Sequence, residues 1–357
     1  MSVSVMVPPS PGSPSTEVSA HVVGQAGCRL PAVEDRGGQG RTASQSSSLA
    51  EESITLATDR SGLGDLVRDL VELTKPRIVT MILITTVIAA VIAAGSWISA
   101  TLLIQLAIGV GLVAGSAGAM NQAWERQLDS RMERTRRRPL AAARLRLSGG
   151  VAFSAVLGIV GTAYLAASVG WIPAALAVAT WVLYVPCYTP LKTRSQWNTA
   201  VGAISGALPM MIGYTAGGGS LTDPRGWLLV GILVAWQYPH FMAIAWLVRK
   251  QYAAAGIRMT TTVDPSGHRA GRQSVIGMLA LAACLVALVF LLSPGWGPIT
   301  GLLVAVVLAS TVPMMAAAFR FARSRDDLTA RKLLRASLLQ LPASLMLMTL
   351  AALYWGR

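Results

Sequence analysis

Residues 100–135 read ATLLIQLAIGVGLVAGSAGAMNQAWERQLDSRMERT, and this stretch decides which fold the chain adopts. Its first part, residues 100–120, contains no charged side chain, whereas residues 121–135 mix acidic, amide and arginine side chains. About 20 apolar residues are enough for a helix to cross a hydrocarbon core of roughly 30 Å. The stretch therefore predicts a membrane-spanning helix that continues as a polar helix outside the membrane.

The whole chain repeats this apolar pattern. It has 357 residues, of which 53% are hydrophobic and only 13% are charged, whereas about a quarter of the residues are charged in soluble domains. This composition excludes ordinary soluble enzymes, disordered chains and coiled coils, and it predicts an all-α, polytopic membrane helix bundle. Nine spans are expected, at roughly residues 78–96, 100–120, 150–169, 171–187, 199–216, 227–248, 274–293, 297–317 and 336–355.

The charges of the chain indicate its topology. Lysine and arginine total 30 against 16 aspartate and glutamate residues, for a formal net charge of +14. The cations gather in the connections after the second, fourth, sixth and eighth expected spans, and the opposite connections hold almost none. Because cytoplasmic loops carry the excess of Lys and Arg, we expect the N-terminus and the basic connections in the cytoplasm. The positive charge therefore requires no nucleic-acid partner.

The start of the chain differs from the rest, since it is rich in proline, serine and glycine. We expect residues 1–60 to form a disordered tail and residues 61–357 to form the membrane domain. The tail has neither the apolar core of a secretory signal nor the acid-poor pattern of a transit peptide, so a bacterial plasma membrane is the expected location. Residues 63–71 then place apolar side chains at helical spacing, which predicts an amphipathic helix at the membrane surface.

Side chains inside the expected spans disfavour a transporter. His240 is nearly the only ionisable residue there, whereas ion-coupled transporters and pumps usually place acids or bases at membrane depth. Glycines four residues apart, such as Gly202 with Gly206 and Gly213 with Gly217, indicate close helix packing and need no further function.

The first candidate site is a ladder of oxygen-bearing side chains directly after the second span. Asn121, Glu125 and Asp129 lie four residues apart, so on a helix they share one face, about 6 Å apart along its axis. Such oxygens suit magnesium, which proteins commonly hold with one or two carboxylates together with substrate phosphates. The alternative is a solvated helix end whose Glu and Arg side chains form i, i+4 pairs.

Two more candidate sites occur at the same expected ends of spans. Lys192 and Arg194 follow Tyr188, and they either hold a diphosphate or only mark the cytoplasmic side. His240, within residues 236–241, offers a base, a metal ligand or a hydrogen-bond donor, with packing as the alternative. Because all three candidates lie at the expected cytoplasmic ends of spans, we expect one face of the bundle to gather them.

With these motifs the sequence resembles the UbiA superfamily of intramembrane prenyltransferases. The acidic motif resembles the whole superfamily, whereas the Pro-His-Phe segment and the basic residues after Tyr188-Thr189 resemble its haem-farnesylating branch. The resemblance extends from Leu73 to the last span and is carried by residues 121–135 with Arg138-Pro139, Tyr188-Thr189, Leu191-Lys192, Gly206-Ala207-Leu208-Pro209, Trp236 with Pro239-His240-Phe241, and Tyr252 with Ala255-Gly256.

The resemblance implies two four-helix groups around a central cavity, with one final helix. It also implies that farnesyl diphosphate donates its farnesyl group to a vinyl group of haem b, giving haem O for terminal oxidases. The implied surroundings are the lipid bilayer, with haem A synthase or oxidase assembly factors as partners.

The resemblance also implies roles for single residues. Asn121, Glu125 and Asp129 would hold magnesium on the diphosphate, while Lys192 and Arg194 would neutralise the leaving group. Tyr188 would orient phosphate or stabilise the allylic cation, and His240 would position haem or assist proton transfer. Further substrate contacts are expected from Arg134, Arg138, Asn198 and His240.

Four positions depart from the family pattern and keep alternatives open. Gln127 stands where relatives often carry Asp, Glu125 replaces the commoner Asp, and Gln251 lies where an Asp is usual. After Gly256 the chain reads Ile257-Arg258-Met259, whereas the family tends to have a proline before the position of this methionine. The exact metal ligands are therefore open. The alternatives are a UbiA-type enzyme for another aromatic or lipid acceptor, a transport protein, and a noncatalytic homologue in oxidase assembly.

Overall fold

The computed structural model describes residues 62–356, and these residues form helices and turns without a strand. The predicted all-α membrane fold is therefore confirmed for this part of the chain. The expected tail, residues 1–60, lies outside the described residues. The helices are α2 (Leu63–Leu73), α3 (Pro76–Ala94), α4 (Ala100–Asp129), α5 (Leu147–Ser168), α6 (Trp171–Val182), η1 (Leu183–Tyr188), α7 (Thr189–Arg194), α8 (Asn198–Ala216), α9 (Pro224–Leu247), α10 (Arg249–Ala254), α11 (Thr260–Val263), α12 (His268–Leu292), α13 (Pro298–Ser324) and α14 (Asp327–Trp355).

Nine helical stretches between residues 62 and 356 are long and apolar enough to cross a membrane, as the sequence predicts. Two of them, α9 and α14, begin earlier than the apolar segments, because a capping side chain outside the segment starts the helix. Asp223 accepts a hydrogen bond from the Arg225 backbone N–H (2.9 Å) and starts α9. Asp326 accepts one from the Thr329 backbone N–H (2.7 Å) and starts α14. Hydropathy thus marks the lipid-crossing part of each helix and not its ends.

The fourth span extends beyond its prediction. The sequence predicts residues 171–187, whereas the helical run continues from Trp171 to Arg194. Its middle, η1, is a π-helix that contains Pro186. Proline has no N–H to donate, so the regular hydrogen-bond ladder cannot pass through it unchanged. The wider turns keep the chain helical, and α7 carries Lys192 and Arg194 as part of the same rod.

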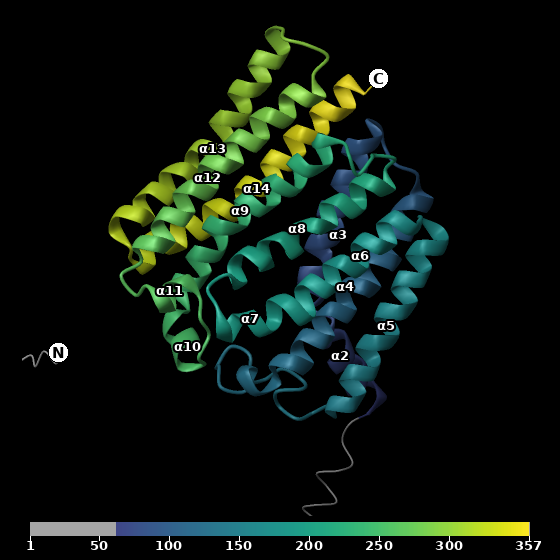
Figure 1. The fold of residues 1–357 in the computed structure, drawn as a ribbon, viewed down its shortest axis with the longest axis vertical. Coiled ribbons are helices and arrows are strands. Elements are labelled where there is room, and N and C mark those ends of the chain that lie inside the picture. The colour runs from purple at the N-terminus through teal and green to yellow at the C-terminus, as the bar shows by residue number, and fades with distance from the viewer. Residues whose placement is uncertain (1–61, 357) are drawn as a thin grey trace, which may run out of the picture. The chain divides into compact units, whose positions relative to one another are not determined.

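The spanning helices pack in two successive groups and a closing helix (Figure 1). Helices α3 to α6 form the first group, and α8, α9, α12 and α13 form the second, while α14 packs against α9, α13 and α3. The groups meet where α8 lies against α3. A Cβ atom on Gly213 would lie 1.8 Å from the Thr86 carbonyl oxygen, and one on Gly217 would lie 2.3 Å from that of Ala90. These glycines therefore permit the close approach that their spacing predicts.

The amphipathic helix predicted at residues 63–71 is present as α2. Its apolar side chains Leu63, Leu66, Val67 and Val71 are exposed, so they remain available to a membrane surface. The end of α2 is fixed to α4, because the Gln122 side chain donates hydrogen bonds to the carbonyls of Glu72 (3.1 Å) and Leu73 (3.2 Å). The turn after α2 thereby comes to lie beside the polar end of α4.

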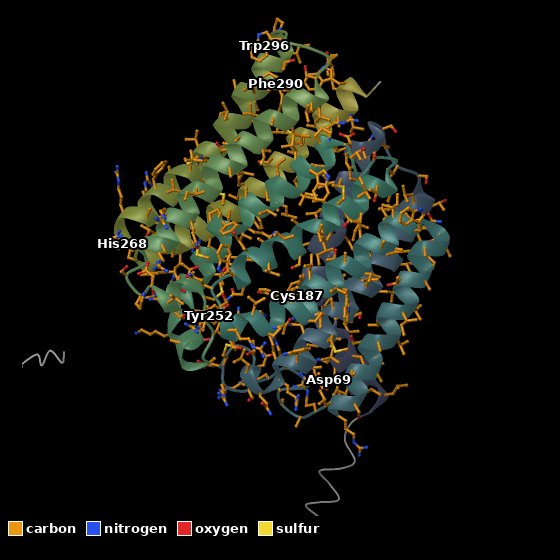
Figure 2. The ribbon with its side chains drawn as sticks, in the orientation of Figure 1. Asp69, Cys187, Tyr252, His268, Phe290 and Trp296 are labelled. Atoms are coloured by element: carbon orange, nitrogen blue, oxygen red, sulfur yellow. The ribbon has the colours of Figure 1, made fainter. Side chains whose placement is uncertain are left out.

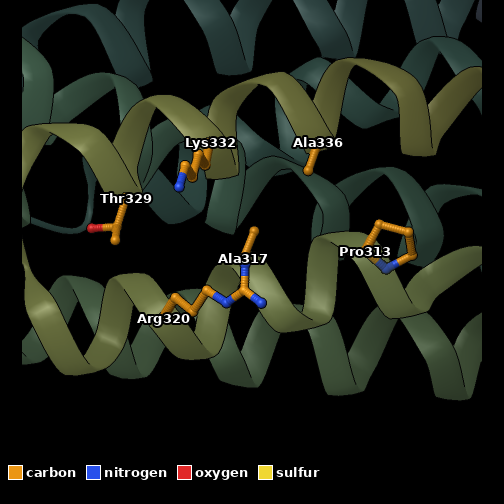
Figure 3. A pocket seen from close by; sticks show the side chains of 6 residues that line it. All are labelled: Pro313, Ala317, Arg320, Thr329, Lys332 and Ala336. Carbon is orange, nitrogen blue, oxygen red and sulfur yellow. The ribbon is translucent and has the colours of Figure 1, made fainter.

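The basic connection between the last two spans stays at the surface. Arg320 of α13 and Lys332 of α14 line one hollow of about 160 Å³, whose other walls include Ala317 and Ala336 (Figure 3). Both cations are exposed, and neither forms an ion pair within residues 62–356. They therefore serve as charges at a helix end, in keeping with the predicted topology.

Candidate active site

The three oxygen-bearing side chains of the predicted ladder lie buried on the last turns of α4. Asn121 and Asp129 are 1% exposed and Glu125 is 7% exposed. Because α4 continues unbroken to Asp129, the three residues keep their four-residue spacing on one face. Glu133 would be the next rung, but α4 ends before it and its side chain is exposed. Burial of this kind does not match the solvated helix end considered as the alternative.

Each rung of the ladder has its own cation, supplied by a different segment. The Lys192 ammonium of α7 lies 2.7 Å from Glu125 Oε1. The Arg138 guanidinium, from the turns after α4, donates to Asp129 Oδ2 at 2.7 Å. The Lys75 ammonium, from the turn between α2 and α3, donates to Asn121 Oδ1. Buried charges are tolerated when they are paired in this way, so the ladder and its cations form one coupled site.

Lys75 is the candidate site residue that the sequence analysis missed, because nothing in its local sequence assigns it to the ladder. The residue has φ 56°, in the left-handed region that non-glycine residues seldom adopt. This turn directs its side chain at Asn121 of the neighbouring helix. Burial, with the positive charges of Lys192 and Arg138 nearby, lowers the pKa of Lys75 to about 7. The sequence signal that could have indicated Lys75 is its place directly before Pro76, which begins α3. The next helix along the chain, α4, carries the ladder.

The π-helix η1 and α7 place aromatic rings beside the ladder. The Lys192 ammonium lies 4.7 Å from the centre of the Tyr188 ring, and the Tyr184 ring lies 5.4 Å from that of Tyr188. Thr189 fixes this segment to α4, because its hydroxyl accepts a hydrogen bond from Asn121 Nδ2 (3.0 Å) and donates to the Tyr184 carbonyl (2.9 Å). The site thus combines oxygens, cations and two ring faces.

The connection after α9 covers this side of the bundle. The Arg258 backbone N–H donates to the Lys192 carbonyl at 2.7 Å. Ala255 and Ile257 are buried against Met132, which follows α4, and Tyr252 of α10, labelled in Figure 2, packs against the same cluster. The chain segments after the second, fourth and sixth spans therefore meet here, as the sequence analysis expects.

Four other predicted site residues lie outside the ladder. Arg134 and Arg194 are exposed. Asn198 is buried and donates to the carbonyls of Ser195 (2.7 Å) and Arg258 (2.9 Å), so it holds the backbone of the connection. His240 packs towards α14, where its Nδ1 lies 2.8 Å from Ser337 Oγ and its ring stacks on Trp236 at 4.5 Å. No hydrogen bond or ion pair between described residues links His240 to the ladder.

The donor set of the ladder suits magnesium. Two carboxylates and one amide oxygen line one helix face, and proteins commonly hold this ion with so few ligands when substrate phosphates supply the rest. Within residues 62–356 no cluster of three or more His, Cys, Asp or Glu side chains exists that could hold a metal without such help. Gln127 and Gln251 are uncharged and add no carboxylate to this small inventory.

Comparison with known proteins identifies the family. The model of the UbiA prenyltransferase family matches residues 82–351. The chain belongs to this family. Among sequences, it is 50% identical over 285 residues to the protoheme IX farnesyltransferase of Rhodopirellula baltica, covering 79% of this chain and 99% of that protein. It is 42% identical to the protoheme IX farnesyltransferase of Solibacter usitatus, covering 60% of this chain and 76% of that protein.

Solved structures of other proteins superimpose on this chain and confirm its fold. A digeranylgeranylglyceryl phosphate synthase superimposes with a TM-score of 0.64 at 14% identity, covering 81% of this chain and 99% of that one. A UbiA homologue from Archaeoglobus fulgidus, bound to DMAPP and Mg2+, superimposes with a TM-score of 0.57 at 11% identity, covering 78% of this chain and 99% of that one. The predicted UbiA-like helix bundle is therefore confirmed.

Proposed function

We propose that this chain transfers the farnesyl group of farnesyl diphosphate to a vinyl group of haem b, giving haem O. The observation that carries this proposal is the buried Asn121, Glu125 and Asp129 ladder, in which every rung faces a cation. The choice of haem b rests on relatives named protoheme IX farnesyltransferase, one of which aligns over 99% of its length. Haem A synthase or oxidase assembly factors are the expected partners, because haem O has to be delivered onward.

The ladder would hold magnesium between its oxygens and the diphosphate. Glu125 and Asp129 supply negative charge and Asn121 a neutral oxygen, which matches the ligands this ion prefers. Bound magnesium would stabilise the negative charge that develops on the departing diphosphate. Three cations already contact the ladder oxygens: Lys75, Lys192 and Arg138. When the diphosphate binds, they would exchange these contacts for hydrogen bonds to its phosphate oxygens.

The bonds change as follows. The bond between C1 of the farnesyl chain and the diphosphate oxygen breaks, and C1 joins the terminal carbon of the vinyl group. Water supplies the hydroxyl of the resulting hydroxyethyl group and releases a proton. Lys192 stabilises the leaving diphosphate, while the faces of Tyr188 and Tyr184, 5.4 Å apart, stabilise the allylic cation. The connection after α9 limits access of bulk water to that cation.

His240 is assigned to positioning the haem acceptor through α9 and not to the diphosphate. Its Nδ1 lies beside Ser337 and its ring stacks on Trp236, so it fixes α9 against α14 on the side of the helix opposite Tyr238. Exposed Arg134 and Arg194 have no contact with the ladder among the described hydrogen bonds, and we assign them to attraction of the anionic substrate. We place the site on the cytoplasmic side of a bacterial plasma membrane, as the basic connections indicate.

The test is transfer by purified protein reconstituted in lipid with haem b, farnesyl diphosphate and magnesium, with products identified by mass. We expect haem O from the unmodified chain and its loss in Asp129→Ala. Glu133→Ala is the matched control, because Glu133 continues the four-residue spacing but is exposed beyond the end of α4. If no haem O forms but another acceptor is prenylated with the same dependence on Asp129, the chain is a prenyltransferase and haem b is not its substrate.

A further inference from the structure

A groove of about 610 Å³ lies between the beginning of α8, the middle of α9 and the beginning of α12. None of its lining residues belongs to the ladder or to its cations. The walls include Trp197 and Thr199 from the start of α8 and Tyr238 of α9, and α12 contributes Arg269 and Arg272. His268, labelled in Figure 2, marks the beginning of α12 at this groove.

The two arginines give the groove a preference for carboxylates. Arg269 and Arg272 are three residues apart on α12, so their side chains share one helix face. Both are exposed, and neither guanidinium forms an ion pair within the described part of the chain. Arg269 has one long hydrogen bond, from Nη1 to Gln196 Oε1 at 3.4 Å. Guanidinium groups bind carboxylates through two parallel hydrogen bonds, so this face can take two carboxylates at once.

The remaining walls suit a flat apolar ligand. Trp197 lines the groove and leaves 69% of its surface exposed, so its ring is available to a ligand. Tyr238 lines the groove from α9. Thr199 and Ala200, which also line the groove, have small side chains. Aromatic side chains stack on planar ring systems. The lining thus combines two carboxylate-binding groups at the helix ends with aromatic surface next to them.

The groove is joined to the ladder through one short chain of contacts. Asn198, adjacent to the groove residues, donates to the Arg258 carbonyl at 2.9 Å, and the Arg258 N–H donates to the Lys192 carbonyl at 2.7 Å. One turn further along α8, the ring of Tyr188 lies over Gly202, where a Cβ atom would be 2.7 Å from it. The beginning of α8 therefore has the groove on one side and Tyr188 on another.

We propose that this groove binds haem b, with Arg269 and Arg272 holding its two propionate carboxylates and Trp197 and Tyr238 flanking the macrocycle. The inference rests on the proposed function, because it takes haem b as the acceptor. Propionates held at the charged helix ends direct the opposite, vinyl-bearing edge of the macrocycle away from the arginines and into the bundle. The arginines are thus positioning residues for the acceptor and have no part in diphosphate departure.

The test compares the Arg269→Gln/Arg272→Gln double variant with the full-length unmodified protein. Haem binding is followed by the Soret absorbance, and KM is measured separately for haem b and for farnesyl diphosphate. We expect the Kd for haem b to rise about tenfold or more, which corresponds to the loss of charge-assisted hydrogen bonds, with an unchanged KM for farnesyl diphosphate. Arg331→Gln is the control, because Arg331 is also an exposed arginine and lies on α14 outside the groove.

A second probe tests the carboxylates themselves. The dimethyl ester of haem b should bind the unmodified protein about as weakly as haem b binds the double variant, and the ester should bind both proteins equally. An Arg269→Lys/Arg272→Lys variant keeps the charges and should recover part of the affinity, which separates recognition from loss of folding.

Each of four results would overturn the inference. One is equal binding of haem b and its dimethyl ester by the unmodified protein, and another is unchanged haem affinity in the double variant. The third is competition by phosphatidylglycerol vesicles as strong as that by free haem, which would make the groove a lipid site. If haem binding depends on both arginines but no haem O forms, the proposed function fails and the groove assignment stands. If haem O forms at the normal KM in the double variant, only the groove assignment fails.

Discussion

Single residues determine the chemistry of the ladder, because each of its oxygens is buried beside one cation. Glu125 faces Lys192, Asp129 faces Arg138 and Asn121 faces Lys75. Leaving a buried charge unpaired costs several kcal/mol, so these cations keep the ladder folded before any substrate arrives. The same cations are the groups that a diphosphate needs. Under the proposed function, stability and substrate binding would therefore share these side chains.

Removal of the Lys75 charge should reduce transfer without unfolding the protein. In Lys75→Met we expect the rate to fall about tenfold or more, because a charge-assisted hydrogen bond is worth about 1.5–3 kcal/mol. Asn121 is neutral, so its burial without the ammonium is tolerated. The measurement is the rate of haem O formation, with the exposed neighbour Arg77→Met as control. Equal rates in the two variants would exclude Lys75 from the site.

The Glu125 and Lys192 pair should show strong coupling in stability. Lys192→Met leaves a buried carboxylate without its cation, and we expect it to lower the free energy of unfolding by about 3–5 kcal/mol. Glu125→Gln/Lys192→Met should be much less destabilised, since neither charge is then left alone. Thermal unfolding in detergent of the unmodified protein, Glu125→Gln, Lys192→Met and the double variant gives the coupling free energy of the pair. Additive losses in the double variant would show that the pair is not energetically joined.

At the scale of helices, α9 depends on the capping residue at its beginning. Asp223 accepts from the Arg225 backbone N–H (2.9 Å) and from the Tyr214 hydroxyl (2.6 Å). Hydrogen bonds from Arg225, and also from Tyr214, lower the pKa of Asp223 to about 2. A lowered pKa favours the folded state above the unfolded value of about 3.9, and this contribution is lost as the pH falls towards 2.

We therefore expect Asp223→Ala to lower the free energy of unfolding at pH 7 by about 1 kcal/mol, the usual value of a helix cap. The difference between Asp223→Ala and the unmodified protein should shrink as the pH falls from about 4 to 2. Unfolding is measured in detergent across this range. A difference that stays constant down to pH 2 would assign the loss to packing and not to the carboxylate.

The contact between α3 and α8 should tolerate no side chain at Gly213. A Cβ there would lie 1.8 Å from the Thr86 carbonyl oxygen, so Gly213→Ala forces the two backbones apart and should cost about 1–3 kcal/mol or more. Gly301→Ala is the control, because Gly301 lies in α13 with open space around it. That change should add about 0.5–1 kcal/mol, since alanine favours a helix over glycine. Equal thermal midpoints would contradict the close contact.

The elements that the sequence predicts correctly are those set by local composition. Each span is an apolar run, and the ladder follows from the four-residue spacing of Asn121, Glu125 and Asp129 on a continuous helix. What the sequence could not show is which cation meets which rung. Lys75 lies 46 residues from its partner Asn121, and only the packing of α2 and α3 against α4 brings them together. The position of His240 against α14 likewise depends on a tertiary contact, with Ser337.

For the molecule as a whole, the arrangement separates folding from metal binding. The helix bundle is held by extensive apolar packing among α8, α9, α12, α13 and α14, and the ladder is already neutralised by Lys75, Lys192 and Arg138. A structural metal site behaves differently, because its ligands have no other partners and the fold is lost without the ion. Magnesium is therefore expected to affect catalysis much more than stability.

Chelation tests this separation. Treatment of the reconstituted protein with EDTA should abolish haem O formation while the thermal midpoint changes by no more than about 2 °C, because the cations of the chain stay in place on the ladder. Added magnesium should restore the rate, and farnesyl diphosphate should raise the thermal midpoint further only when magnesium is present, since the ion and the diphosphate complete each other's charge. Unfolding on chelation would show that the ion supports the bundle itself, and transfer at full rate in EDTA would leave diphosphate departure to Lys75, Lys192 and Arg138 alone.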